Sequence, residues 1–281
     1  MTTKTVSELF TLHAVHFAHS WQWVRPGFLE AFRRIVADGL WREDSGCEVI
    51  WRTRHKYTLK IPLADGHGAV ACKCYPRMRL FPYLHYWSPT TREACNYCKL
   101  ELLGLPMARV LAVGGERRFF RPLSCFIVTE FAEGFRDGRA FFPGGDLEDR
   151  REWRDEFCRR NFALIAKLHD AGYYHRGFTP MNELWHARKT PDGEGHALDL
   201  RWIDVATCHA ARGERLRRRI AADLANFLRF WEFSPERRRE LLKVYLDAAQ
   251  VRRFELDELS GMVEAALAER LEHQREKQLR K

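Results

Sequence analysis

Residues 173–185, YYHRGFTPMNELW, carry side chains whose types and spacing suit phosphoryl transfer. In the loop pattern H-R-D-x-x-x-x-N, the Asp accepts the proton of the attacking hydroxyl and the Asn binds a metal ion. His175, Arg176 and Asn182 stand at the spacing of this pattern, whereas Gly177 occupies the position of the Asp. The sequence therefore predicts a phosphoryl-transfer loop from which the base is missing.

A second group of residues lies upstream, on a segment with the composition of a β-strand. Residues 70–73, VACK, fit the V-A-I-K pattern, in which the lysine contacts nucleotide phosphates. Alternate side chains of a strand share a face, so Ala71 would leave room for an adenine ring beside the cation of Lys73. Glu93 begins the next predicted helix, where a carboxylate can pair with that lysine. Each residue also has an ordinary explanation, as a polar strand-edge residue or as an acid at a helix start.

Two later segments complete the set. Residues 127–134, IVTEFAEG, are typical of a buried strand that ends at Glu130 and could offer backbone groups to an adenine. Residues 198–207, LDLRWIDVAT, are strand-like and lead to Asp204. Asn182 and Asp204 supply hard oxygen ligands of the kind that Mg²⁺ uses when it bridges nucleotide phosphates. The order of these features predicts ATP and Mg²⁺ as cofactors.

Charge and composition leave several partners open. The net charge of +9 comes from 47 basic and 38 acidic side chains, and it favours anionic partners. Nucleic acid is not expected, because the basic residues are dispersed along the chain. Arg77 and Arg79 lie among aromatic residues in YPRMRLFPYLHYWSP, which could meet an anionic saccharide or lipid headgroups, or simply pack as a loop. No apolar run is long enough for a membrane span and no signal peptide is visible, so we expect a cytoplasmic protein.

The cysteines permit one competing interpretation. Cys72 and Cys74, followed by Cys95 and Cys98, resemble the two halves of a four-thiolate zinc site. The alternative is that they are buried thiols, because free cysteine is among the most buried residue types. We favour this alternative, since the first pair lies in a strand pattern, where zinc knuckles are unusual.

The order of the predicted elements indicates an α+β fold. Residues 1–42 are expected to form a helical N-terminal extension, followed by a β-rich lobe with one helix over residues 43–134. A glycine-rich segment near residues 131–145 marks the boundary to a helical lobe over residues 135–281. We treat these three ranges as the predicted domains.

In this order, the motifs resemble those of the Kdo and heptose kinases of the lipopolysaccharide core, a family of the protein-kinase-like superfamily. The likeness runs from about Cys47 to Phe230 and includes VACKCYPR, IVTEFAEG, KLHDAGYYHRGFTPMN and RWIDVATC. The resemblance implies a two-lobed protein-kinase-like fold. It also implies ATP-dependent phosphorylation of a sugar hydroxyl in lipopolysaccharide core or a related anionic glycan, with peripheral contact to the inner membrane.

The same resemblance assigns roles to individual residues. Lys73 and Glu93 would form an ion pair, Glu130 would belong to the hinge, and Asn182 and Asp204 would hold the metal. His175 would organise the loop from a buried position, with Arg176 as a neighbouring support.

Gly177 departs from the family pattern, because glycine cannot accept a proton. A general base contributes about 10² to 10⁴ in rate, whereas most of the catalysis of phosphoryl transfer comes from positioning and electrostatics. Three hypotheses therefore stay open: a slow kinase, a kinase whose base comes from the substrate, and a nucleotide-binding pseudokinase.

Overall fold

A computed structural model describes residues 20–63, 68–76, 89–118, 121–189 and 196–279. The chain separates into two compact units. The first consists of Met1–Leu102 with Met107–Glu133, and the second consists of Leu103–Pro106 with Gly134–Lys281. The aromatic loop that carries Arg77 and Arg79 lies outside the described residues.

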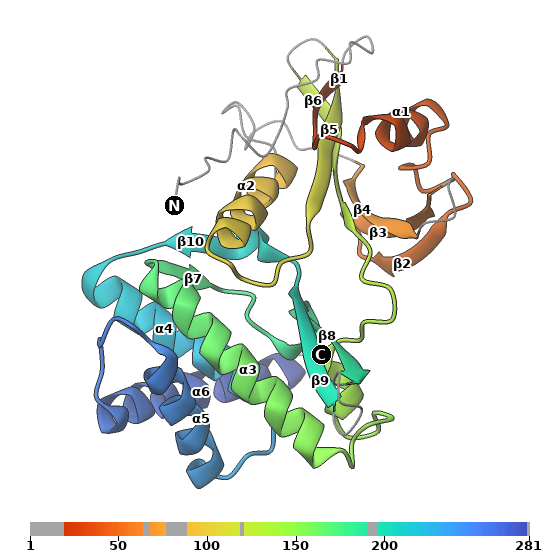
Figure 1. The fold of residues 1–281 in the computed structure, drawn as a ribbon. Coiled ribbons are helices and arrows are strands. Elements are labelled where there is room, and N and C mark those ends of the chain that lie inside the picture. The colour runs from red at the N-terminus through yellow and green to blue at the C-terminus, as the bar shows by residue number, and fades with distance from the viewer. Residues whose placement is uncertain (1–19, 64–67, 77–88, 119–120, 190–195, 280–281) are drawn as a thin grey trace. The chain divides into compact units, whose positions relative to one another are not determined.

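The first unit is built on a six-stranded antiparallel sheet with the strand order β1-β5-β6-β4-β3-β2 (Figure 1). Its strands are β1 (Ser20–Val24), β2 (Glu48–Arg52), β3 (Tyr57–Pro62), β4 (Ala69–Tyr75), β5 (Val110–Arg118) and β6 (Arg121–Glu130). Two helices accompany the sheet, α1 (Leu29–Ala37) and α2 (Pro89–Leu102).

The helical N-terminal extension expected over residues 1–42 is only partly helical where the structure describes it. Ser20–Val24, SWQWV, forms β1, which pairs antiparallel with β5 and places Ser20 opposite Glu116. Tryptophan and valine suit a strand, and the free edge of β5 supplies the hydrogen-bond partners that make one. Between residues 20 and 42 only Leu29–Ala37 is an α-helix.

α1 packs on one face of the sheet and forms the core there. Phe32 and Ile35 of the helix are buried in the same cluster as the inward-facing residues of β4. Those β4 residues are Val70, Cys72 and Cys74. Since side chains alternate along a strand, Ala71 and Lys73 lie on the opposite face of the sheet. Cys72 and Cys74 are therefore core thiols, with their sulfur atoms 3.5 Å apart.

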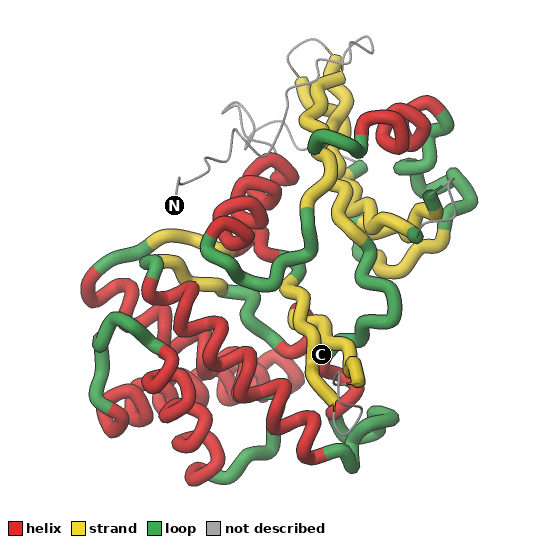
Figure 2. The backbone as a smooth tube through the Cα atoms, in the orientation of Figure 1, coloured by secondary structure: helices red, strands yellow, loops and turns green. Residues whose placement is uncertain are grey.

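The second unit is mainly helical (Figure 2). Its long helices are α3 (Arg151–Asp170), α4 (Gly213–Leu228), α5 (Pro235–Ala248) and α6 (Leu256–Leu279). The unit also contains two short two-stranded sheets. β7 (Tyr173–His175) pairs with β10 (Cys208–Ala210), and β8 (Glu183–Lys189) pairs with β9 (His196–Trp202). The predicted change from a β-rich to a helical part is confirmed. No helix in the described ranges is long and apolar enough to cross a membrane.

Candidate active site

Lys73 and Glu93 form a buried ion pair in the first unit. Lys73 Nζ, on β4, lies 2.9 Å from Glu93 Oε1, on α2, and the two side chains are 14% and 1% exposed. Desolvation of two charges at this depth offsets much of their attraction, so such a pair contributes little to stability. Its effect is to hold the lysine ammonium in one orientation on the sheet face that also carries Ala71.

The sheet register adds a residue that the sequence analysis missed. Lys60 of β3 stands directly opposite Ala71 of β4, and therefore on the same face. Its ammonium forms an ion pair with Glu133 over 3.1 Å and lies 4.5 Å from the ring centroid of Phe131. No local signal distinguishes Lys60 from other strand lysines, because its position depends on how β3 pairs with β4.

Glu130 ends β6, as predicted, and its backbone N–H and its carboxylate both have partners. Its backbone N–H donates to the carbonyl oxygen of Arg109 over 2.9 Å, so this N–H is not available to a ligand. Its half-exposed carboxylate lies 3.7 Å from the guanidinium of Arg109. Any backbone contact of this segment with an adenine would therefore use a group other than the N–H of Glu130.

In the second unit, His175 organises the loop between β7 and β8. Its side chain is fully buried, and its Nδ1 accepts a hydrogen bond from the backbone N–H of Gly177 over 3.1 Å. The N–H of His175 donates to the carboxylate of Asp223 on α4. Burial lowers the pKa of His175 to about 4, so the imidazole is neutral near pH 7 and keeps the lone pair that this contact requires.

α4 supplies two buried polar residues that the sequence analysis missed, Asp223 and Asn226, which are 2% and 3% exposed. The Asn226 amide nitrogen donates to the carbonyl oxygens of Arg176 and Phe178, over 3.3 and 2.9 Å. These carbonyls flank Gly177, so Asn226 fixes the backbone on both sides of it. The sequence contains one signal that could have identified them: an Asp and an Asn stand three residues apart within the otherwise apolar run IAADLANFL.

Asn182 and Asp204 lie just beyond the same end of the β8–β9 hairpin. Glu183 stands opposite Trp202 in that hairpin, and the N–H of Ile203 donates to the carbonyl oxygen of Asn182 over 2.9 Å. Asp204 has a φ of 54°, the only positive value among the described residues other than glycine. Left-handed backbone at such a residue is uncommon and clusters at functional sites.

These two residues fit a magnesium site. The amide nitrogen of Asn182 donates to the carbonyl oxygen of Gly177 over 2.8 Å, which leaves its amide oxygen as the atom that can bind a cation. Together with the carboxylate of Asp204, it provides the hard oxygen ligands that Mg²⁺ prefers.

Gly177 lies in a crowded place. A Cβ atom there would lie 3.0 Å from Cε1 of His175, 3.2 Å from Oγ1 of Thr207 and 3.4 Å from Nδ2 of Asn182. Its backbone is not left-handed, so its conformation does not require glycine.

Neither acidic residue near the loop in the sequence replaces the missing base. Glu183 is fully buried, its carboxylate has no hydrogen-bond partner among the described residues, and burial raises its pKa well above the ordinary value. Burial therefore favours its protonated form, which cannot act as a base. Asp170 instead accepts hydrogen bonds from the backbone N–H groups of Gln250 and Val251, over 2.7 and 3.1 Å.

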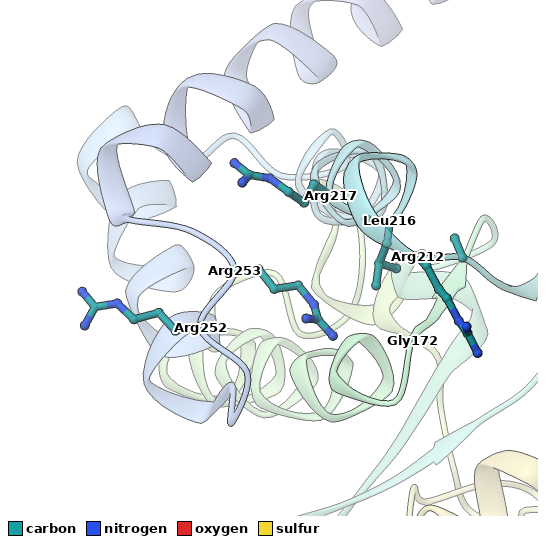
Figure 3. A pocket seen from close by; sticks show the side chains of 8 residues that line it. Gly172, Arg212, Leu216, Arg217, Arg252 and Arg253 are labelled. Carbon is teal, nitrogen blue, oxygen red and sulfur yellow. The ribbon is translucent and has the colours of Figure 1, made fainter.

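A hollow elsewhere in the second unit is lined mainly by arginine and glycine. It measures about 430 Å³ and is lined by Gly172, Ala211, Arg212, Gly213, Leu216, Arg217, Arg252 and Arg253 (Figure 3). Figure 3 shows the Arg217 and Arg252 side chains pointing away from Gly172. They form ion pairs with Glu258 and Glu255, so their charges neither converge on the hollow nor remain uncompensated.

The sequence model of the lipopolysaccharide kinase (Kdo/WaaP) family matches residues 86–245, more than half of the chain. The chain belongs to the lipopolysaccharide kinase (Kdo/WaaP) family. The predicted family is thereby confirmed. A comparison of this family member with curated proteins found no match.

Two solved structures resemble this lipopolysaccharide kinase family member. WaaP in complex with acyl carrier protein has a TM-score of 0.61 and 20% sequence identity, covering 91% of this chain and 98% of WaaP. The Rio2 kinase–ADP/Mg²⁺–phosphoaspartate complex from Chaetomium thermophilum has a TM-score of 0.47 and 15% identity, covering 94% of this chain and 82% of Rio2. The similarity to WaaP confirms the predicted protein-kinase-like fold.

Proposed function

We propose that the protein transfers the γ-phosphoryl group of ATP to a sugar hydroxyl of lipopolysaccharide core or a related glycan. The observation that carries this proposal is the buried Lys73–Glu93 ion pair. Kinases use such a pair to hold a lysine on the nucleotide phosphates. In the reaction, the acceptor oxygen forms a bond to phosphorus, the bond to the β,γ-bridging oxygen breaks, ADP leaves, and the hydroxyl proton passes to solvent.

In this proposal some residues of the site bind the nucleotide and the metal, and others position the loop. Lys73 contacts the phosphates, Ala71 leaves room for the adenine, and Asn182 with Asp204 would hold Mg²⁺. When bound, this ion neutralises charge that develops on the phosphate oxygens. His175 and Asn226 keep the loop around Gly177 in one conformation, so that the acceptor meets a fixed backbone.

The missing base makes this a slow kinase. Because the transition state of phosphoryl transfer is loose, positioning and charge supply most of the catalysis and the hydroxyl can lose its proton late. Absence of the base then lowers the rate by about 10² to 10⁴. The competing function is that of a nucleotide-binding pseudokinase, which Gly177 favours because no acid near the loop in the sequence takes over the role of the Asp.

The family and the charge also support a proposal for the acceptor and for the location of the protein. We propose an anionic glycan acceptor, a cytoplasmic protein and a peripheral contact with the inner membrane. The membership in a lipopolysaccharide kinase family and the net charge of +9 support these assignments.

Calorimetric titration with ATP and Mg²⁺ tests the proposal. We expect the wild-type protein to bind ATP and Lys73→Ala to bind it at least about tenfold more weakly, because a charge-assisted contact to phosphate is lost. Lys167→Ala, which removes an exposed lysine of α3, serves as the matched control and should bind normally. A wild-type protein that fails to bind ATP at saturating Mg²⁺ would refute both the kinase and the pseudokinase.

A further inference from the structure

Positive charge gathers along one face of α4, next to the loop that carries Gly177. Arg219, Ala222, Asn226 and Arg229 follow one another at intervals of three and four residues, the spacing that places side chains on one face of a helix. Arg229 is the C-cap residue of α4. At a rise of 1.5 Å per residue, the two arginines mark the ends of a row about 15 Å long.

Arg270 of α6 docks on the middle of this row. Its guanidinium donates to the amide oxygen of Asn226 over 3.2 Å and to the carbonyl oxygen of Ala222 over 3.1 Å. The same Asn226 side chain donates to the carbonyl oxygen of Arg176, in the loop before Gly177. A single amide side chain therefore connects the cation of α6 to the backbone of the loop.

Aromatic rings, rather than acids, support the two end residues of the row. The Arg219 guanidinium lies 5.5 Å from the ring centroid of Tyr174, two residues before Arg176, and that of Arg229 lies 4.6 Å from the ring of Phe230. A guanidinium that stacks on a ring keeps its N–H groups for a ligand. The Nε of Arg229 is buried and has no hydrogen-bond partner in the described part of the chain.

The arginines around this row form no close ion pair within the described residues. Arg176, Arg219, Arg229 and Arg270 form no ion pair there, whereas Arg218 on the same helix pairs with Glu214. Burial lowers the pKa of Arg270, and the charges of Arg219 and Arg176 add to this effect against those of Asp223 and Glu269. Burial, together with the charge of Arg270, also lowers the pKa of Arg229.

We propose that Arg176, Arg219, Arg229 and Arg270 bind anionic groups, phosphate or carboxylate, of the acceptor saccharide. Guanidinium forks match both kinds of anion through paired N–H···O bonds. A row about 15 Å long suits an acceptor that carries more than one such group. This inference rests on the proposed function, since it specifies the acceptor of that reaction.

Calorimetry without nucleotide tests the proposal with deacylated inner-core oligosaccharide of lipopolysaccharide, which carries phosphate and carboxylate groups. We expect Arg219→Gln and Arg229→Gln each to weaken binding by about five- to tenfold, through the loss of a charge-assisted contact. Arg218→Gln removes an exposed, ion-paired arginine from the same helix and should change binding less than about twofold. Parallel titrations with dephosphorylated and with carboxyl-reduced oligosaccharide identify which anion the row recognises, and thermal melting confirms that each variant is folded.

Several outcomes would overturn the inference. Equal binding by the Arg218, Arg219 and Arg229 variants, no binding by the wild type at low salt, or undiminished binding of oligosaccharide that lacks both anions would each do so. Weakened binding of acyl carrier protein, with oligosaccharide binding unchanged, would make the row a protein-docking surface instead. Failure of the proposed function is a different result, because it appears as a lack of ATP binding in the absence of any oligosaccharide.

Discussion

The side-chain amide of Asn182 donates a hydrogen bond to the carbonyl oxygen of Gly177 over 2.8 Å. This contact closes the loop on itself, and the Gly177 N–H is bound to His175 at the same time. Both backbone polar groups of the glycine are therefore fixed. The loop keeps a defined conformation although the side chain that should do the chemistry is missing.

Restoring the base should increase phosphoryl transfer. In Gly177→Asp the backbone needs no left-handed conformation, and the new Cβ requires its neighbours His175 and Thr207 to shift by a few tenths of an ångström. We expect a gain of up to about 10²-fold in ADP release that depends on the acceptor oligosaccharide. Gly177→Asn is the matched control, because it has the same size but cannot take a proton.

An equal gain in Gly177→Asn would show that packing, and not proton transfer, limits the wild type. A wild-type rate of about 1 to 100 per second, typical of kinases, would contradict the slow kinase. Folded variants that both bind ATP and acceptor but do not turn over would favour the pseudokinase.

Removing the charge of Asp204 should abolish the effect of Mg²⁺ on nucleotide binding. Asp204→Asn is suitable because Asn tolerates the left-handed backbone at this position, so the fold is maintained while a hard anionic ligand is lost. Titration of ATP with and without Mg²⁺ measures the effect. Cys95→Ser, which changes a half-buried thiol of α2, should leave the Mg²⁺ dependence unchanged. A stoichiometric zinc signal that Cys95→Ser removes would instead support the thiolate site.

The buried carboxyl of Glu183 should make stability fall as the pH rises. In the unfolded chain it loses its proton near pH 4.3, whereas in the folded protein burial raises its pKa well above the usual value. Above pH 4.3 the folded protein therefore keeps a proton that the unfolded chain has released. This lowers the free energy of unfolding by about 1.4 kcal/mol per pH unit until the folded pKa is reached. The stability that this carboxyl contributes is fully present below pH 4.3. It is lost as the pH rises from there to the pKa of the folded protein.

Glu183→Leu should remove this dependence. Urea unfolding at pH 4, 5.5 and 7 should give a difference in free energy between the two proteins that grows with pH in favour of the variant. Glu183→Gln separates loss of charge from loss of polarity. A constant difference across the pH range would mean that the wild-type carboxyl finds a partner on folding.

Asn226 of α4 should stabilise the loop around Gly177 through its two hydrogen bonds to the loop backbone. Asn226→Ala leaves the carbonyl oxygens of Arg176 and Phe178 without their donor, which costs about 1 to 3 kcal/mol. We expect a lower melting temperature and faster hydrogen exchange at Gly177, measured by mass spectrometry of the loop peptide. Unchanged exchange there, with a lower melting temperature, would limit Asn226 to packing between α4 and α6.

The sequence alone determined those parts of the site that depend on local periodicity. Alternation along AVACKCY placed Ala71 and Lys73 on one strand face, and the spacing from His175 to Asn182 identified the loop. Side-chain direction and turn spacing are set within a few residues, so these features can be predicted without tertiary contacts. The motifs in order then sufficed to predict the family and the kinase-like fold.

Only the tertiary structure decided which distant residues meet. β1 is a strand because the edge of β5 pairs with it, and Lys60 faces the same way as Ala71 because of the β3–β4 register. Asp223 and Asn226 reach the loop only because α4 packs against it. The protonation states of buried groups such as Glu183 depend on the desolvation that such packing creates. Pairing and burial join residues far apart in the chain, so a local pattern can mark a residue but does not determine which distant residue it meets.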